Sequence, residues 1–373
     1  MEVEQVSRVY IVRHAEAEGN LYRRAHGHYD SLITDNGNLQ IEALRERFSG
    51  ENVDVVLSSD LKRTSKTASV ISGGRRERAV LHPGLREIHM GDWEDLPWGQ
   101  ILRENPLCYE TFEKEPWRAT IPGGESVARL SERVWAAFNE IIARYAGKTV
   151  AIVSHAMAIQ SLMCRLDGRP IETFKSEPLY DNASVTAFDF ENGRAKFICR
   201  GDNSHLGDLS TYNKLRRQRI SGGPHGTNMW FRPVDIETEL NIYLRLLRIA
   251  GTGGFDERAE YVRFERLTAI TPQAVQFAML GDDVAGILQL DIENTGKPRC
   301  GIIDNMCLLP AYQEKGLGVQ LLGQAVSFYR RLGKDKIAMY LSNMRDVREY
   351  FKKYGFFEQD SAGDGFISLI KII

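Results

Sequence analysis

The sequence lacks several features that mark particular classes of protein. Its five cysteines are an odd number and never form Cys-x-x-Cys, which argues against a disulfide framework or zinc site and for reduced thiols in the cytoplasm. The formal net charge is only −2, so neither nucleic acid nor an anionic membrane is expected as a partner. No apolar run approaches the roughly 18 residues of a membrane helix, and the acidic N-terminus contains no apolar signal stretch.

The length favours two domains, because 373 residues are many for a single hydrophobic core. A basic stretch followed by a Gly/Pro cluster occupies residues 213–228 and has the composition of a linker. The predicted domains are therefore residues 1–212 and 229–373. Apolar residues make up 43% and charged residues 26% of the chain, as in ordinary globular proteins.

The first motif is an apolar run, Val9 to Val12, that ends in Arg13-His14. Such a run predicts a buried parallel strand with a charged pair at its C-terminal end. Ligands of open α/β sheets bind at that end. A guanidinium can hold phosphoryl oxygens while a neutral imidazole nitrogen attacks phosphorus, so the pair suits phosphoryl transfer.

The same pattern occurs twice more in the first half. A predicted strand over 53–57 is followed by Ser-Ser-Asp at 58–60, which we expect to cap a helix with Arg63 in its first turn. Another predicted strand over 149–154 ends in His155. We expect the ends of these strands to converge on one crevice. The other elements expected here are helices over 38–48 and 127–145 and an antiparallel pair over 183–188 and 195–199, with 21–36 a loop and 89–124 irregular.

These motifs together resemble the histidine phosphatase superfamily, which includes the cofactor-dependent phosphoglycerate mutases. The resemblance covers roughly residues 6–212 and is carried by Arg-His-Ala-Glu at 13–16, Asn20, the block around Arg63, Leu-Arg-Glu-Ile at 85–88 and Val-Ser-His-Ala at 153–156. Ala15 and Ala156 replace glycines of the family pattern. The resemblance implies a doubly wound, mostly parallel α/β sheet.

It also implies the roles of individual residues. His14 would become phosphohistidine, Glu87 would act as acid and then base, and His155 would complete the catalytic group. Arg13, Asn20 and Arg63 would hold the phosphate, without metal or cofactor. The implied substrate is a small phosphorylated metabolite. Hydrolysis is preferred because residues 88–124 lack the longer inserts of mutases, although mutase-type transfer stays open.

The second half has a different pattern, with helices expected over 235–250 and 256–267 and strands over 274–280, 284–291 and 302–309. The last strand leads through Gln-x-x-Gly-x-Gly into an apolar helix, which places free backbone amides where a pyrophosphate can bind. Together with Tyr-Phe-Lys-Lys-Tyr-Gly-Phe at 350–356, this half resembles the GNAT acetyltransferase superfamily, which implies an α+β fold, acetyl-coenzyme A and an amine acceptor. The implied cofactor-binding residues are Met306, Cys307, Leu308, Gln313, Lys315, Gly316, Leu317, Gly318 and Asn343.

Two positions bear on catalysis by this half. Asp304 stands where some relatives keep a carboxylate base. Phe351 replaces the family's general-acid tyrosine, while Tyr350 stands one place earlier. Because one residue turns a helix by about 100°, we expect Tyr350 not to reach the thiolate that Phe351 would face. The half would then transfer acetyl groups with another acid or only sense the cofactor; a scaffold with two inactive halves is a further alternative.

Overall fold

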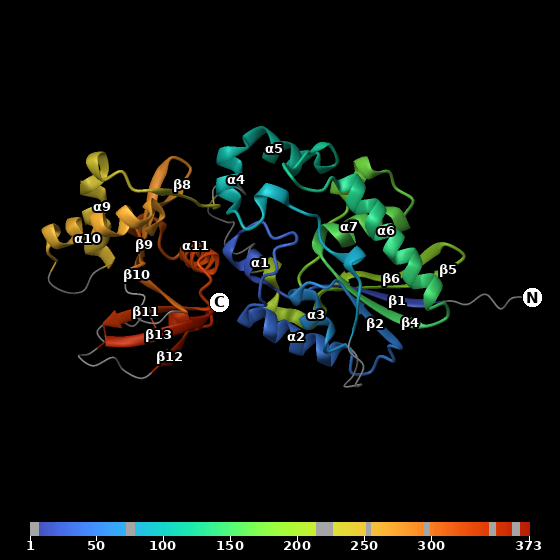
Figure 1. Ribbon diagram of the computed structural model, residues 1–373. Helices are drawn as coiled ribbons and strands as arrows, with labels where there is room; N and C mark the ends of the chain where they lie inside the picture. Colours follow the sequence, from blue (N-terminus) through green and yellow to red (C-terminus); the bar gives the residue numbers. More distant parts are fainter. Residues whose placement is uncertain are drawn as a thin grey trace, which may run out of the picture. The chain divides into compact units, whose positions relative to one another are not determined.

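The computed structural model describes residues 7–71, 79–213, 227–250, 255–293, 299–342, 348–359 and 366–373. These residues fall into two compact units (Figure 1). The first is drawn from Met1–Asn20, Arg24–Leu96 and Glu104–Arg217, and the second from Leu21–Arg23, Pro97–Arg103 and Gln218–Ile373. Two short segments before residue 212 therefore group with the second unit. Most of the expected linker, residues 214–226, lies outside the described residues.

The first unit is built on a six-stranded sheet of order β3-β2-β4-β1-β5-β6. Strands β1 to β4 run parallel, and β5 joins β1 in antiparallel register and pairs with β6 at the edge. The sheet elements are β1 Ser7–Arg13, β2 Val55–Ser58, β3 Val80–Leu81, β4 Thr149–Ser154, β5 Val185–Glu191 and β6 Arg194–Asp202. The helices of this part of the chain are α1 Glu18–Tyr22, α2 Asp35–Arg47, α3 Lys62–Ala68, α4 Trp98–Glu104, α5 Pro106–Lys114, α6 Val127–Arg144 and α7 Ala156–Leu166. Of these, the end of α1 and all of α4 except Glu104 group with the second unit.

Helices cover both faces of this sheet, with α2 and α3 on one side and α6 and α7 on the other (Figure 1). Alternate residues of each strand face opposite sides, so Tyr10 and Val12 of β1 pack in one core with Leu44 of α2. On the opposite face, Phe138 of α6 lies against Phe188 of β5, with ring centroids 6.3 Å apart. The central strands are therefore buried on both sides, as their continuous apolar runs predict.

Two local expectations for the first half are wrong. Helix α3 begins at Lys62 with Leu61 at its N-cap and no side-chain cap bond from that residue. The Lys62 N–H instead donates to the carboxylate of Asp30, at 2.7 Å, and Asp60 pairs with Arg86, at 2.6 Å. The stretch over 89–124, expected to be irregular, contains α4 and α5. Arg63 still lies in the first turn of α3.

The second unit is built on a seven-stranded sheet of order β12-β13-β11-β10-β9-β8-β7. Among the described strands of this second sheet, only β10 and β11 pair in parallel. Its strands are β7 Trp230–Pro233, β8 Val275–Leu280, β9 Asp283–Asp291, β10 Cys300–Leu308, β11 Lys336–Ser342, β12 Phe357–Gln359 and β13 Phe366–Ile372. Its helices are α9 Ile236–Ala250, α10 Glu257–Ile270, α11 Gly318–Arg331 and α12 Arg348–Lys352.

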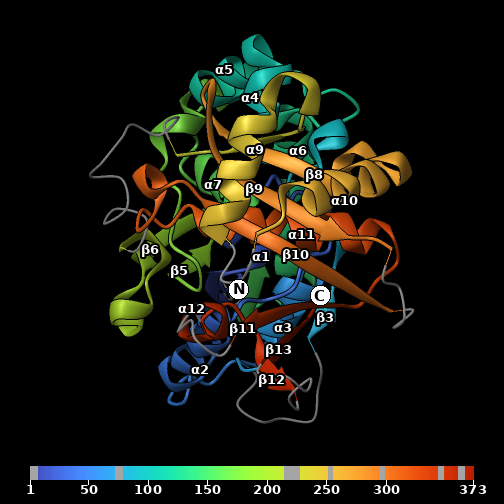
Figure 2. The same ribbon diagram turned by 90° about the vertical axis from the view of Figure 1, so that its left-hand side faces the viewer.

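The helices of this unit also form two layers. Tyr243 of α9 and Phe264 of α10 pack with Phe277 of β8 in one core, and Figure 2 shows both helices in front of strands β8 to β10. Leu322 and Val326 of α11 pack on the other face of the same sheet. The arrangement is the α+β architecture expected for the second half.

Candidate active site

Two neighbouring parallel strands bring His14 and His155 together. Arg13 of β1 stands in register with Ser154 of β4, and the backbone N–H of His14 donates to the Ser154 carbonyl at 3.0 Å. Each histidine directly follows its strand, so both reach the C-terminal edge of the sheet. Their ring centroids are 5.2 Å apart, and both residues are buried, His155 completely.

The surroundings of His14 fix which ring nitrogen is free. Its Nδ1 lies 2.7 Å from the carbonyl oxygen of Ala15. A carbonyl can only accept a hydrogen bond, so Nδ1 carries the proton and Nε2 keeps the lone pair. Burial, together with the positive charges of Arg63 and Arg13, holds the pKa of His14 well below 6.5. The imidazole is therefore neutral at pH 7, as a nitrogen nucleophile requires.

Arg63 is held by three protein acceptors. Its Nε donates to Nδ1 of His155 at 3.2 Å, its Nη1 to the Tyr29 carbonyl at 2.9 Å and its Nη2 to the Gly27 carbonyl at 2.7 Å. A guanidinium has five N–H groups, so one N–H on each terminal nitrogen is not used by these bonds. Burial lowers the pKa of Arg63 to about 10, which leaves it charged at neutral pH. The side chain can therefore hold two oxygens of one anion.

Two further donors at this edge are buried and have no hydrogen-bond partner among the described residues: Nε of Arg13 and Nε2 of His155. Nη1 of Arg13 is fixed by the Tyr180 carbonyl. His155 accepts from Arg63 through Nδ1, so its proton lies on Nε2. Unpaired buried donors are costly. Next to a charged arginine, they fit a ligand with several acceptor oxygens, such as a phosphoryl group.

Glu87 and Asn20 lie at the same edge of the sheet. The Glu87 carboxylate accepts from the backbone N–H groups of Met157 and Ala158, at 3.1 and 3.0 Å, in the first turn of α7. It thus sits at the start of the helix that follows His155. Oδ1 of Asn20 accepts from the Ala17 N–H at 3.1 Å and from Asn182 at 3.3 Å.

The sequence did not point to Asn182 or to the backbone acceptors around Arg63. Nδ2 of Asn182 donates to the carbonyl oxygen of His14 at 3.0 Å and so links the nucleophile's backbone to Asn20. The carbonyls of Gly27 and Tyr29 lie in the segment expected to be a loop. Every residue has a backbone carbonyl, so the sequence cannot show which carbonyls accept from Arg63. Of these residues, only the glycine at position 27 could have drawn attention in the sequence.

The two buried histidines give a stability prediction. Both have pKa values well below 6.5 in the folded protein, whereas the unfolded chain binds protons near pH 6.5. Stability is therefore expected to fall as the pH drops below 6.5, by up to about 1.4 kcal/mol per pH unit for each histidine. Urea unfolding of the parent and of His155→Gln at several pH values between about 7.5 and 5.5 measures this. The variant should show the shallower pH dependence; equal slopes would contradict the account.

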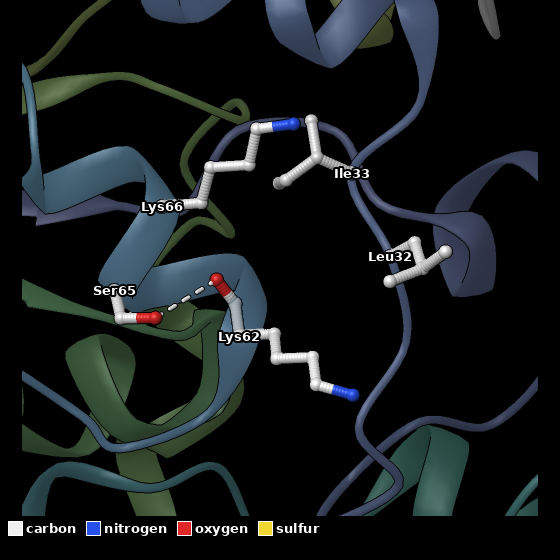
Figure 3. A pocket seen from close by; sticks show the side chains of 5 residues that line it. All are labelled: Leu32, Ile33, Lys62, Ser65 and Lys66. Carbon is white, nitrogen blue, oxygen red and sulfur yellow. Dashed lines mark hydrogen bonds between the residues drawn. The ribbon is translucent and has the colours of Figure 1, made fainter.

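A cavity of about 460 Å³ lies elsewhere in the first unit (Figure 3). Its lining consists of Leu32, Ile33, Lys62, Ser65 and Lys66. Both lysine side chains and Ser65 come from α3, and the two aliphatic side chains face them from the opposite segment (Figure 3). None of the expected site residues lines it.

In the second unit, the loop between β10 and α11 has the features expected of a pyrophosphate site. Gly316 has a φ of 69°, which favours glycine, and Leu317 caps α11 without a side-chain bond to its free amides. Strand β10 pairs with β11 only over Cys300–Ile303, so among the described residues the segment from Asn305 to Leu308 pairs on one side only, with β9. That open edge can accept an extended ligand.

The other residues of this unit that were expected to bind the cofactor make different contacts. Nε2 of Gln313 donates to the Leu308 carbonyl at 2.7 Å, Lys315 lies over the Tyr312 ring at 6.0 Å, and Sγ of Cys307 is 3.2 Å from the Leu246 carbonyl. Met306 packs against the apolar core. Asn343 lies outside the described residues.

Asp304 is already engaged. Its carboxylate pairs with Nη2 of Arg263 at 2.9 Å and accepts from Nε2 of Gln289 at 2.6 Å. Burial raises the pKa of Asp304 despite the positive charge of Arg263. To act as a base, Asp304 would have to give up its contact with Arg263 or Gln289 and bind the substrate amine instead.

The expected orientation of Phe351 toward the site is wrong, whereas the expectation that Tyr350 does not reach the thiolate stays a prediction. Phe351 is 5% exposed and packs in the core, with its ring centroid 5.3 Å from that of Phe356. The Tyr350 hydroxyl instead lies at the start of α11, 2.5 Å from where a Cβ on Gly318 would stand. The turn of the helix does separate the two side chains, but the apolar one turns inward and the tyrosine faces the loop.

Comparisons with known proteins agree with this geometry. The family model of the histidine phosphatase superfamily (branch 1) matches residues 9–203, more than half of the chain. The chain belongs to the histidine phosphatase superfamily. A model of the acetyltransferase (GNAT) family matches residues 241–356, so both predicted families are confirmed in one chain.

Two curated proteins and one solved structure are similar to the histidine phosphatase domain. Phosphoserine phosphatase 1 of Hydrogenobacter thermophilus is 30% identical over 202 residues, which are 54% of this chain and 95% of the relative. A probable phosphoglycerate mutase GpmB of Yersinia pestis is 32% identical over 223 residues, 56% of this chain and 99% of the relative. The solved structure of Bacillus stearothermophilus YhfR, 30% identical, matches with a TM-score of 0.52 over 54% of this chain and 99% of its own. The predicted fold of both halves is confirmed.

The described residues contain neither a candidate membrane span nor a candidate metal site. No helix there combines the length and apolar character needed to cross a membrane. No group of three or more His, Cys, Asp or Glu side chains in that part of the chain could hold a metal ion.

Proposed function

We propose that the histidine phosphatase domain hydrolyses small phosphomonoesters through a phosphohistidine on His14. The observation that carries this proposal is the state of His14: a buried, neutral imidazole whose Nε2 lone pair is free, beside Arg63 and His155. The relatives named as a phosphatase and a probable mutase support phosphoryl chemistry.

The steps follow from the donors and acceptors present. Arg13, Arg63, His155 and Asn20 hold the phosphoryl oxygens, and the two arginines neutralise their charge. Nε2 of His14 attacks phosphorus, the P–O bond to the leaving group breaks, and Glu87 gives that oxygen a proton. Glu87, now a carboxylate, then takes a proton from the water that attacks phosphohistidine, which releases phosphate and restores His14.

Transfer of the phosphoryl group within a phosphoglycerate, as in mutases, is the alternative. A probable phosphoglycerate mutase among the relatives favours it, and a phosphoserine phosphatase favours hydrolysis. A screen of purified full-length protein against phosphorylated metabolites, phosphoserine and 3-phosphoglycerate included, distinguishes the two. Hydrolysis gives free phosphate, whereas a mutase gives an isomer of its substrate and little free phosphate.

For the GNAT domain we propose acetyl-coenzyme A binding and acetyl transfer to an amine. The residues present fit the cofactor: Gly316 adopts a positive φ in the loop, Gly318 begins α11 without a side chain, and the one-sided edge of β10 leads into the loop. Acetyl-coenzyme A would supply an activated acetyl group there. Tyr350, whose hydroxyl lies at the same loop, could hold a proton at its Oη. Sensing of the cofactor without transfer is the alternative for this domain.

Binding by the loop is open to a direct test. Gly316→Glu is expected to weaken acetyl-coenzyme A binding to full-length protein by at least about 100-fold, because a side chain is strained at this φ and its carboxylate would repel a pyrophosphate. Gly333→Glu is the matched control, since Gly333 has a similar φ of 70° and its Cβ would meet open space. Calorimetry measures both. Absence of binding in the parent, or equal losses in both variants, would contradict the assignment.

The remaining proposals concern the whole chain. We propose domains over 1–212 and 229–373 joined by 213–228, in line with the two family matches. All five cysteines are free thiols, which supports a cytoplasmic protein. The proposed partners are a phosphorylated metabolite and an amine, with neither nucleic acid nor membrane.

A further inference from the structure

We propose that Glu94 is a positioning residue that orients Arg63 and His155 through the segment between them. The proposal rests on the function proposed for the histidine phosphatase domain. Glu94 follows a short turn, Gly91–Trp93, and none of the motifs in the sequence includes it.

The Glu94 carboxylate accepts four backbone hydrogen bonds. Three come from consecutive residues, with the N–H groups of Gly27, His28 and Tyr29 at 3.1, 2.6 and 2.8 Å. The fourth comes from the N–H of Met90, at 2.9 Å. Bonds from backbone N–H to an ionised carboxylate are among the stronger hydrogen bonds of proteins. One side chain therefore fixes the 27–29 segment and ties it to the chain near Met90.

The same segment holds Arg63 from its other side. The backbone N–H groups of Gly27 and Tyr29 donate to Glu94. The carbonyl of Gly27 accepts from Nη2 of Arg63, and the carbonyl of Tyr29 accepts from Nη1. The segment is thus a spacer between a carboxylate and a guanidinium. Glu94 also counters the effect of burial on the charged form of Arg63.

Gly27 makes this arrangement possible through its size. A Cβ at this position would stand 2.1 Å from the Ile88 carbonyl oxygen and 2.6 Å from Oε1 of Glu94. Its φ is not in the left-handed region, so space rather than backbone conformation requires glycine. The Gly27 backbone and the carboxylate pack too closely for any side chain between them.

The consequence reaches His155. Nε of Arg63 donates to Nδ1 of His155 and thereby keeps the His155 proton on the unpartnered Nε2. If Glu94 no longer fixes the 27–29 segment, Arg63 loses its fixed acceptors and His155 loses the donor that sets its tautomer. Both of these oxygen-binding groups would then be misaligned together.

The test replaces Glu94 by glutamine in full-length protein. The amide keeps the shape but presents an NH₂ toward N–H groups, so the segment should shift. We expect kcat/KM for p-nitrophenyl phosphate to fall about 100-fold, the effect of a displacement of roughly 1 Å in a positioned site. The affinity for orthovanadate should fall by at least about tenfold, since the same oxygen-binding donors are displaced. Gly27→Ala, which keeps the carboxylate, should reproduce both losses.

The histidine tautomer gives a readout that general destabilisation would not move. In ¹⁵N-histidine NMR spectra, the signal that His155→Gln removes should show an Nε2–H tautomer in the parent and an averaged one in Glu94→Gln. The matched control is Asp189→Asn, which removes a carboxylate paired with Arg8 at the opposite end of β1 and should leave the signal, the vanadate affinity and the activity unchanged.

An unchanged His155 signal and vanadate affinity in folded Glu94→Gln, or in Gly27→Ala if the former fails to fold, would overturn the proposal. A parent protein that hydrolyses no phosphomonoester would instead contradict the proposed function. In that case the His155 signal still decides whether Glu94 positions Arg63 and His155.

Discussion

Replacement of His14 by alanine is expected to lower the hydrolysis of phosphomonoesters by at least about 10,000-fold, because the reaction loses its nucleophile. The variant keeps Arg13, Arg63 and His155, so substrate binding should largely persist while kcat is lost. Steady-state kinetics with p-nitrophenyl phosphate, with phosphate release as the readout, measures the loss.

The control for this variant is His82→Gln, which removes a partly exposed histidine that pairs with Glu140 and accepts from the Gly84 N–H and that has no role in the proposed steps. Its kcat/KM should stay within about threefold of the parent, as for substitutions outside the site. Activity of His14→Ala near that of the parent would show that another group, or water directly, attacks phosphorus.

The second large effect is expected from Glu87→Gln and depends on the leaving group. An amide cannot give a proton to an alkoxide, whereas a nitrophenolate leaves with little help. General acid catalysis typically contributes about 100- to 10,000-fold, so an alkyl phosphate should lose far more activity than p-nitrophenyl phosphate. The glutamine oxygen can accept from only one of the two α7 amides that the carboxylate binds, so any structural loss should be shared by both substrates and the difference between them reports the missing acid.

Glu125→Gln is the matched control for Glu87. Glu125 pairs with Arg133, which donates to the backbone carbonyls of Arg86 and Glu87, so this variant perturbs the same segment without touching the acid. This variant should lower the activity toward the alkyl phosphate and toward p-nitrophenyl phosphate by the same factor. Equal losses for the two substrates in Glu87→Gln would assign Glu87 to structure rather than to proton transfer.

The sheet and the two histidines could be predicted because their signals are local. Buried parallel strands appear as continuous apolar runs, and a polar residue that directly follows such a run must lie at the strand end. His14 and His155 are of this kind, and the order of the strands then brings them together. Arg63 could be placed as well, although its helix starts without the expected cap.

The rest depends on tertiary contacts that leave no local mark. Gly27 and Tyr29 act through carbonyl oxygens, which every residue has, and Asn182 lies in a turn far along the chain from His14. The orientation of α12 could not be predicted from its spacing alone. Phe351 faces inward because an apolar core lies on that side, and this leaves Tyr350 toward the loop.

The central claim, a phosphohistidine on His14, is tested most directly by rapid quench of the parent enzyme with ³²P-labelled p-nitrophenyl phosphate. We predict a burst of nitrophenol close to the enzyme concentration and a base-stable, acid-labile phosphate adduct that peptide mass spectrometry places on His14. Glu87→Gln should accumulate more of this adduct, because the water that resolves it has lost its base. Release of phosphate without a burst and without any adduct, in both proteins, would contradict the account.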